Sequence, residues 1–283
     1  MTVYANVMIK DEAILLPEVY KQWKDYPMDH WVFYNDNSTD NTEEVIRDLF
    51  GKNATILNDK REGFNESHNR SRMLEHSRDK AEFVVCIDTD ELMSANLIAN
   101  WEEVLEHHKN YDLQYFWYNV VGSLGRRRND PLYRQNYRTF ILPMEHTGEF
   151  DMSQYKYHTP RTPKINLPVA QIKDVGFIHL QAINKKFYAM KQLWYKHYEY
   201  VTWNHTVEYI NNRYDPVINN LDFNEAPTPF EVVGDIEFDP SIYDEMEHSK
   251  GYLRFIKQHY KSELVTFGKE YMENNHDSKN HRV

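Results

Sequence analysis

The chain has 283 residues, of which 41% are hydrophobic and 14% aromatic, and its formal net charge at pH 7 is −11. This composition can build one large α/β domain, or one domain of typical size with an extension, and it excludes global disorder. Because nucleic-acid binding relies on neutralising phosphates, the negative charge argues against a nucleic-acid partner. Any anionic ligand must be held locally, by a metal ion, a few basic side chains or a helix N-terminus.

The single cysteine, Cys86, lies inside an apolar run and is expected in the core. One cysteine allows no intrachain disulfide, which fits a reducing compartment. The first residues lack the basic start and long apolar core of a signal peptide, and no apolar run approaches the roughly 18 residues of a membrane span. We therefore expect a cytoplasmic protein without a transmembrane segment.

Apolar strands and amphipathic helices alternate through the first third of the chain. The expected strands are Val3–Ile9, Trp31–Tyr34 and Ala54–Leu57. Helical spacing of apolar residues begins near Leu15, and further helices are expected at Glu43–Phe50 and from Asn65 to about Lys80. This order is typical of βαβ units around a mainly parallel sheet, whose ligands bind at the carboxyl ends of the strands.

A short apolar run, FVVCI, ends abruptly in the acidic sequence DTDE at Asp88–Glu91. Such a run is typical of a strand buried on both faces, so its acidic end is expected at the carboxyl edge of the sheet. In extended geometry Asp88 and Asp90 project to the same side. Neighbouring carboxylates repel each other unless a cation lies between them, and an oxygen pair suits Mg²⁺ or Mn²⁺. The alternative is a solvated acidic loop in which one aspartate caps the next helix.

The remaining segments are less regular. Further strands are expected at Leu113–Val121, Thr139–Leu142 and Ile172–Leu180. The basic segment Gly122–Arg138 contains three consecutive arginines, and it is either a solvated loop or a mobile flap whose arginines meet a diphosphate. Helical periodicity from Asn184 onward predicts an α/β domain of residues 1–183 and a mostly helical extension, residues 184–283, packed on it.

Three segments resemble one enzyme family; they read VMIKDEAILLPEVYKQW, VFYNDNSTDNTEEV and VVCIDTDELM. In order and spacing they are similar to the inverting family-2 glycosyltransferases of the GT-A fold, and to the subgroup whose motifs read roughly (R/K)NEA, DNxSTDxT and DxDE(F/L). The resemblance covers about residues 3–100, continues weakly to His179 and does not reach the last hundred residues. It implies an α/β fold with a Rossmann-like, mainly parallel sheet flanked by helices, and a hexosyltransferase activity.

The resemblance also implies roles for individual residues. The implied nucleotide-sugar contacts are Asp11, Asp36, Asp40, Arg70, Asp88 and Lys164. The implied ligands of a Mn²⁺ or Mg²⁺ ion are Asp88, Asp90 and His179, the last of which resembles a histidine that family members often place at the end of a late strand. Lys164 and Arg161 could both assist the diphosphate, and a surface position is the competing and preferred expectation for each. Asp11 departs from the subgroup, which usually has asparagine there. A carboxylate at this position would repel a diphosphate unless it faces the base or ribose.

The implied chemistry is transfer of a sugar to an acceptor hydroxyl with inversion at the anomeric carbon. A metal would neutralise the leaving nucleoside diphosphate, and a carboxylate would take the proton from the acceptor. No motif singles out this base; by position Asp151 and Glu149 come first, and Glu145 and Asp174 follow. The expected donor is a UDP-sugar, and the acceptor is a glycan, a lipid-linked molecule or a protein.

Two other classes of protein compete with this function. A sugar-phosphate nucleotidyltransferase also places carboxylates at a sheet edge, but it normally begins with a glycine-rich phosphate loop, and the sequence near Ile9–Glu12 has none. A non-catalytic nucleotide- or sugar-binding module would be indicated by loss of one D-x-D carboxylate, and both are present. The glycosyltransferase hypothesis is therefore preferred.

Overall fold

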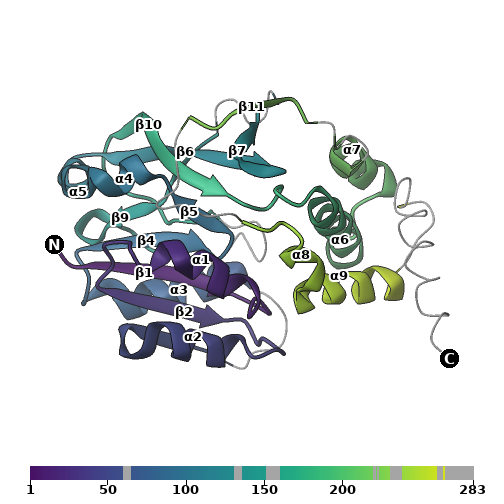
Figure 1. The fold of residues 1–283 in the computed structure, drawn as a ribbon, viewed down its shortest axis with the longest axis horizontal. Helices are drawn as coiled ribbons and strands as arrows, with labels where there is room; N and C mark the ends of the chain where they lie inside the picture. Colours follow the sequence, from purple (N-terminus) through teal and green to yellow (C-terminus); the bar gives the residue numbers. More distant parts are fainter. Residues whose placement is uncertain are drawn as a thin grey trace.

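The computed structural model describes residues 1–59, 65–130, 136–150, 160–218, 221, 223–229, 238–259 and 264. Two sheets organise this part of the chain, and helices cover them (Figure 1). The first sheet is built mainly from the first 90 residues, and in this view the second lies above it. The fold is therefore a mixed α/β fold with mainly parallel pairing at its centre, as the sequence predicts.

The first sheet has five strands in the order β3-β2-β1-β4-β9. They are β1 (Val3–Ile9), β2 (His30–Asn35), β3 (Ala54–Leu57), β4 (Phe83–Asp88) and β9 (Ile141–Pro143), of which only β9 is antiparallel to its neighbour. Met8 of β1 lies in register with Tyr34 of β2 on one side and Asp88 of β4 on the other. The carboxyl ends of these three strands therefore meet at one edge, where open sheets of this class bind ligands.

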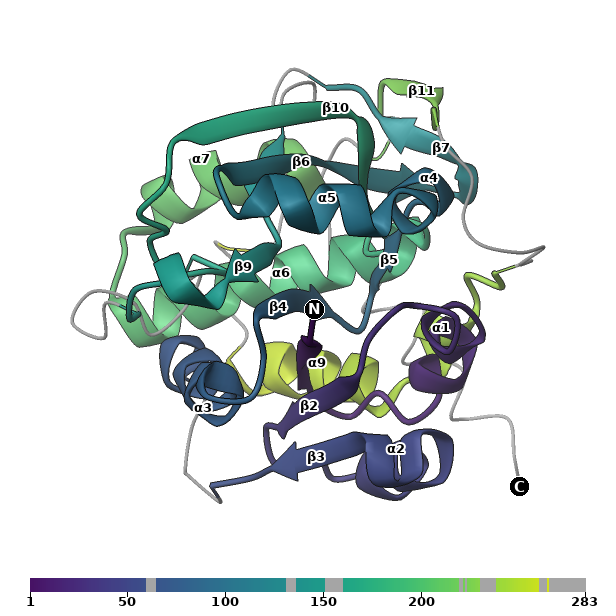
Figure 2. The same ribbon diagram turned by 90° about the vertical axis from the view of Figure 1, so that its left-hand side faces the viewer.

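Helices bury both faces of this sheet. They are α1 (Leu15–Trp23), α2 (Thr42–Phe50) and α3 (Glu66–Arg78), and Figure 2 shows α3 on one side of the strands and α1 and α2 on the other. Because successive strand residues point to opposite faces, Phe33 packs on Phe50 of α2, whereas Tyr34 packs with Met73 of α3. Burial on both faces explains why these strands are nearly continuous apolar runs.

The second sheet pairs β6 in parallel with β10. Its strands are β5 (Glu91–Met93), β6 (Asp112–Val121), β7 (Ser123–Arg128), β8 (Tyr137–Thr139), β10 (Val169–His179) and β11 (Glu225–Pro227). The helices α4 (Ala95–Ala99) and α5 (Trp101–His108) lead from β5 to β6. In the register of the sheet, His179 lies opposite Glu91 on one side and Asn119 on the other. The end of β10 thus comes beside the acidic end of β4.

The basic segment that we expected as a loop or flap is largely strand. Arg126 in β7 donates from Nε to Glu225 Oε2 at 3.3 Å, and Arg128 donates from Nη1 to Tyr188 Oη at 2.9 Å. Residues 131–135 lie outside the described part of the chain. The loop prediction was wrong for β7 because the groups that pair with these arginines come from segments about 60 and 100 residues further along the chain.

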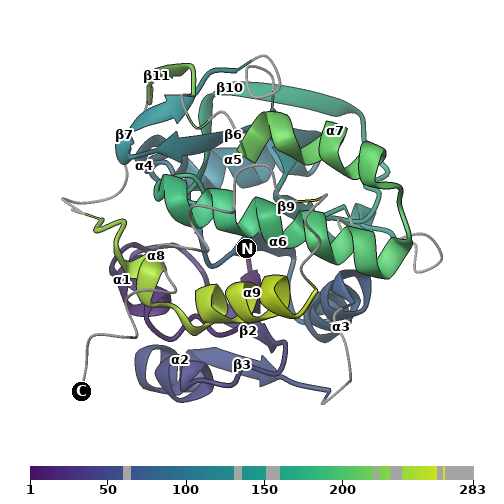
Figure 3. The ribbon, with the colours of Figure 1, turned by 90° about the vertical axis from the view of Figure 1, so that its right-hand side faces the viewer.

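Four helices, here called the C-terminal helices, follow the second sheet. They are α6 (Lys185–Trp203), α7 (Val207–Ile218), α8 (Ile242–Glu245) and α9 (Glu247–Gln258). The Asn184 side chain caps α6 by accepting a hydrogen bond from Phe187 N at 3.0 Å. Phe187 and Tyr252 belong to the same hydrophobic cluster as the first sheet, and Figure 3 shows α6 and α9 in front of that sheet. The division at residue 183 stays a prediction.

Membrane insertion by a helix finds no support in the described residues. None of their helices is both long enough and apolar enough to cross a bilayer. The longest, α6, has 19 residues, but lysine, glutamine, histidine and glutamate side chains occur along it.

Candidate active site

The loops after β1 and β2 are tied together by their own acidic side chains. Asp11 has a positive φ of 50°, a region that aspartate and asparagine tolerate, and its Oδ1 accepts from Thr39 N at 2.5 Å. Asp40 accepts from Thr42 N at 3.0 Å and from Ala13 N at 3.2 Å. Two of the predicted nucleotide contacts therefore also fix the shape of these loops, and the Asp11 carboxylate is engaged within them.

Asp36 follows β2 directly and is nearly buried, with 4% of its surface exposed. Its N–H donates to Ile9 O at 2.9 Å, and its Oδ1 accepts from Asn69 Nδ2 of α3 at 3.2 Å. Lys10 Nζ donates to Asp36 O at 2.7 Å and lies 3.7 Å from Oδ2. These contacts hold the carboxylate at the carboxyl edge of the sheet, where the sequence places a nucleotide contact.

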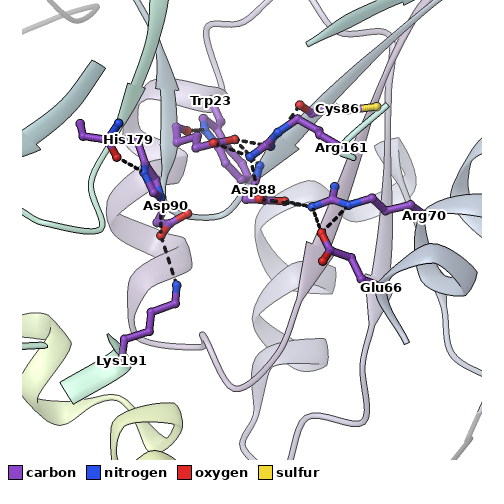
Figure 4. Close-up of polar contacts among 11 residues, drawn as sticks. Trp23, Glu66, Arg70, Cys86, Asp88, Asp90, Arg161, His179 and Lys191 are labelled. Carbon is purple, nitrogen blue, oxygen red and sulfur yellow. Dashed lines mark hydrogen bonds and ion pairs between the residues drawn. The ribbon is translucent and has the colours of Figure 1, made fainter. Parts of the chain in front are cut away.

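Two arginines from distant parts of the chain hold Asp88. Arg70 of α3 donates from Nη2 to Oδ1 at 3.2 Å, and Arg161 donates from Nη2 to Oδ2 at 2.9 Å (Figure 4). Burial opposes the charged form of Asp88, but the two guanidinium groups outweigh it and lower its pKa. The predicted site residue Arg70 is thus brought to Asp88. Arg161, for which a surface position was the competing expectation, is instead largely buried.

Glu91 has a fully buried side chain that binds Arg161 through both carboxylate oxygens. Arg161 Nη1 donates to Oε2 at 2.6 Å and Nη2 to Oε1 at 2.7 Å, while Asp88 N donates to Oε2 at 2.8 Å. The guanidinium lies 4.9 Å from the centre of the Phe140 ring and 5.7 Å from that of Trp117. A two-point ion pair of this kind is directional, so it fixes the turn between β4 and β5.

Asp90 lies in this turn and contacts different groups from Asp88. Its Oδ2 is 3.3 Å from His179 Nε2, and His179 Nδ1 is 2.7 Å from Asn119 Oδ1. The Asn119 amide nitrogen donates to Trp117 O at 3.3 Å, which leaves its oxygen to accept from Nδ1–H. A neutral His179 therefore directs the Nε2 lone pair at a carboxylate, and these two acceptors require a proton or a metal ion between them.

Asp90 and His179 fit a hard divalent ion such as Mn²⁺ or Mg²⁺. Ligands about 2.1 Å from an octahedral ion stand roughly 3 Å apart, close to the 3.3 Å between these two atoms. The hydrogen bond from Asn119 orients the imidazole, as partners of metal-binding histidines do. Within the described residues no group of three or more His, Cys, Asp and Glu side chains could hold a metal. Participation of Asp88 stays a prediction, since its oxygens face arginines.

Glu12, in the loop after β1, is a second acidic group beside Asp90. Burial raises the pKa of Glu12 to about 8, and the charge of Asp90 adds to the rise while Thr89 and Lys191 oppose it. Lys191 of α6 reaches the same place, with Nζ 3.9 Å from Asp90 Oδ2. Burial opposes the charged form of Asp90 as well, but His179 and Lys191 hold its pKa well below the ordinary range.

The raised pKa of Glu12 predicts a pH-dependent stability. Between about pH 5 and pH 8 the folded protein keeps a proton that the unfolded chain, with an ordinary pKa of 4.5, has released, so the free energy of unfolding falls as pH rises. Because Glu12 is partly exposed, we expect about 1–3 kcal/mol from this group. Urea unfolding at pH 5 and at pH 8 measures this fall in the free energy of unfolding. In Glu12→Gln the fall should be smaller than in the wild type by about 1–3 kcal/mol. The exposed Glu44→Gln is the control, and an unchanged pH dependence in Glu12→Gln would contradict the prediction.

The candidate bases that the structure describes lie away from Asp90. Glu149 is exposed and pairs with Arg78 at 2.9 Å, at the C-terminal end of α3 and about 12 Å along the helix axis from Arg70. Glu145 lines a cavity together with Phe83, at the amino end of β4. The structure therefore does not bring either glutamate to the acidic end of that strand, and their catalytic roles stay predictions.

Three further predicted residues have no described contact at the site. Lys164 has an exposed side chain, and its backbone oxygen accepts a hydrogen bond from Gly148 N at 3.0 Å. Asp151 and the side chain of Asp174 lie outside the described residues. Their roles also stay predictions.

Sequence reasoning gave no site role to Glu12, Glu91, Asn119 or Lys191. The first two belong to the quoted motifs, which could have marked them. Asn119 is a polar residue in the aromatic strand Leu113–Val121, and a polar group in such a run is a recognisable signal. Lys191 stands among other polar residues of a helix, and no local signal distinguishes it.

Comparison with known families gives one sequence match. Residues 13–169, more than half of the chain, match the model of the family described as Glycosyl transferase family 2. This range contains most of the first sheet and extends to the start of β10. No curated protein matches the chain.

Several solved structures resemble this one at low sequence identity. TarS residues 1–349 from S. aureus has a TM-score of 0.44 and 12% identity, covering 69% of this chain and 64% of its own. The mannosyltransferase PcManGT from Pyrobaculum calidifontis, in complex with GDP-Man and Mn²⁺, has a TM-score of 0.44 and 15% identity, covering 69% and 61%. Glucosyl-3-phosphoglycerate synthase from Mycobacterium tuberculosis, with Mn²⁺, UDP-glucose and phosphoglyceric acid, has a TM-score of 0.33 and 16% identity, covering 41% and 44%. The chain spans less than two thirds of the length of each.

Proposed function

We propose, because this chain belongs to glycosyl transferase family 2, that it transfers a sugar from a nucleotide-sugar donor to an acceptor hydroxyl, with inversion at the anomeric carbon. The observation that carries the proposal is the pairing of Asp90 Oδ2 with His179 Nε2, 3.3 Å apart at the carboxyl edge of the parallel sheet. Two acceptor atoms directed at each other fit a cation, and a cation at this edge fits a diphosphate ligand.

The proposed donor site extends from the loop after β2 to the turn after β4. Asp36 and Asp11 would lie on the side of the nucleotide, which we expect to be uridine, and Asp88 would contact the ribose or diphosphate. Asp40 shapes the loop that carries these contacts. Lys164 remains a proposed diphosphate contact, although its side chain is exposed.

Asp90 and His179 would hold the Mn²⁺ or Mg²⁺ ion. When bound, such an ion neutralises charge on the leaving nucleoside diphosphate. Asn119 keeps the proton of His179 on Nδ1, so that Nε2 remains free to donate its lone pair. The chain's own contribution is therefore a carboxylate that stays ionised and an imidazole held in one tautomer.

For the general base we propose Asp151, ahead of Glu149. The base must take the proton of the acceptor hydroxyl while the hydroxyl oxygen attacks the anomeric carbon. The attack comes from the side opposite the bond between that carbon and the diphosphate, which breaks. Glu149 is paired with Arg78 and largely exposed, which does not suit this task. The chain reaches the site at Arg161, ten residues after Asp151. The acceptor would be a glycan, a lipid-linked molecule or a protein.

A thermal-shift panel of UDP-, GDP-, CMP- and dTDP-sugars, with and without Mn²⁺, tests this proposal. A ligand at about 100 times its dissociation constant adds roughly 2.7 kcal/mol to the free energy of unfolding if it binds only the folded state. We expect one nucleotide class, the UDP-sugars, to stabilise the protein and to need Mn²⁺ for it. If no member of the panel raises the melting temperature, the donor site is not where we place it.

A further inference from the structure

Lys191 is the basic group at this site whose charge is least engaged by the protein. Arg70 is bonded to Glu66 and Asp88, and Arg161 to Glu91 and Asp88. The Lys191 ammonium, by contrast, makes no hydrogen bond with any residue in the described part of the chain. Its nearest acceptor, Asp90 Oδ2, lies 3.9 Å away, which is too far for a hydrogen bond (Figure 4).

This lysine is also mostly buried. Its side chain is 17% exposed, and Nζ lies 5.9 Å from the centre of the Phe187 ring. An ammonium group carries three donors, and those of Lys191 have no acceptor within hydrogen-bond distance among the described residues. The position of Nζ therefore suits an acceptor from a ligand bound beside Asp90.

A buried hydroxyl near the same carboxylates has no described partner either. Tyr243 is 1% exposed, and its Oη makes no hydrogen bond with any residue that the structure describes. Burial raises the pKa of Tyr243, and the charges of Asp90 and Glu12 add to the rise, which places both carboxyl groups near this ring. Buried polar groups are normally satisfied, so an unpartnered hydroxyl in this place points to a ligand.

The C-terminal helices bring these groups together. Phe187 and Lys191 are four residues apart in α6 and so lie on one face of the helix. The Phe187 ring packs against the Tyr243 ring of α8, with 4.6 Å between centroids. The packing of α6 on α8 thus sets both Lys191 and Tyr243 toward the turn that contains Asp90.

We propose that Lys191, with the hydroxyl of Tyr243, binds the diphosphate of the nucleotide-sugar donor, so that the C-terminal helices complete the donor site. Both groups can donate hydrogen bonds, which suits the acceptor oxygens of a diphosphate. This inference rests on the proposed function. It gives the C-terminal helices a direct role in holding the leaving group, beside the cation at Asp90 and His179.

Calorimetric titration of the full chain with UDP and with uridine, in the presence of Mn²⁺, tests this role. Lys191→Met should weaken UDP binding about tenfold to a hundredfold and leave uridine binding unchanged, because only UDP carries the diphosphate. Lys191→Arg should retain more affinity than Lys191→Met. Lys186→Met, which changes an exposed lysine of the same helix, should bind UDP as the wild type does.

A second variant keeps the test independent of folding. Tyr243→Phe removes only an oxygen that has no partner, so it should melt at the wild-type temperature or higher and bind UDP several-fold more weakly. UDP binding within threefold of wild type in Lys191→Met would overturn the inference and leave the proposed function standing. A wild type that binds none of the nucleoside diphosphates UDP, GDP, CDP and dTDP would overturn both.

Discussion

Replacing Asp90 by asparagine is expected to lower sugar transfer by at least about a hundredfold and to remove the dependence of donor binding on Mn²⁺. Asparagine keeps the size of the side chain but loses the charge that lies 3.3 Å from His179 Nε2. A neutral amide oxygen is a poor substitute for a carboxylate toward a hard cation. Release of nucleoside diphosphate from the donor, followed with and without Mn²⁺, measures the effect.

Two further variants serve as a control and as a test of the expected metal site. Asp48→Asn changes an exposed aspartate of α2 and should keep wild-type turnover. Asn119→Ala removes the group that orients His179 while leaving both expected ligands, so it should lower Mn²⁺ affinity by roughly tenfold or more. Wild-type turnover in Asp90→Asn, with the Mn²⁺ dependence retained, would contradict the role given to Asp90.

The first sheet could be predicted closely because local sequence determines it. Val3–Ile9 and Ala54–Leu57 are found with the expected bounds, since each is an apolar run closed by polar turn residues. The short strand Glu91–Met93 was missed, because only its pairing with residues near His179 makes it a strand. Three residues carry too little pattern to reveal such a pairing.

The two-residue alternation of side chains in a strand does not apply to the turn at the acidic end of β4. The sequence predicts that Asp88 and Asp90 project to the same side, which holds only while the chain stays extended. The strand ends at Asp88, and a turn follows before Glu91. Asp88 consequently contacts arginines, and Asp90 contacts a histidine and a lysine. The position of the acidic cluster and the place of His179 beside it were predicted, but the contacts of Asp88 with Arg161 and of Asp90 with Lys191 were not.

The partners themselves come from parts of the chain that are distant in sequence. Arg161, His179 and Lys191 are about 70 to 100 residues from the aspartates that they contact. Of these three residues, only His179 was marked as a site residue by a local feature of the sequence, its place at the end of a late strand. No property of the sequence around Arg161 distinguishes a buried arginine from a solvated one, because its burial depends on Phe140 and Glu91.

Replacing Arg161 by methionine should reduce the free energy of unfolding by about 3–5 kcal/mol. The change leaves the fully buried Glu91 carboxylate without its two-point partner, and it removes one of the two cations that hold Asp88. Urea unfolding followed by circular dichroism at neutral pH measures the loss. Arg72→Met is the matched control, because Arg72 is half exposed and its pairs with Glu75 and Asp59 should contribute less than about 1 kcal/mol.

A double variant separates the ion pair from the packing of the long arginine side chain. If the cost comes from an unpaired buried charge, Arg161→Met combined with Glu91→Met should recover part of the stability lost in Arg161→Met alone, because no buried carboxylate then lacks a partner. Recovery should be incomplete, since Asp88 N also loses its acceptor on Glu91. The single variant Glu91→Met completes the comparison. If the double variant loses as much stability as Arg161→Met and Glu91→Met added together, Glu91 and Arg161 act independently, and this ion pair does not hold the turn that carries Asp90.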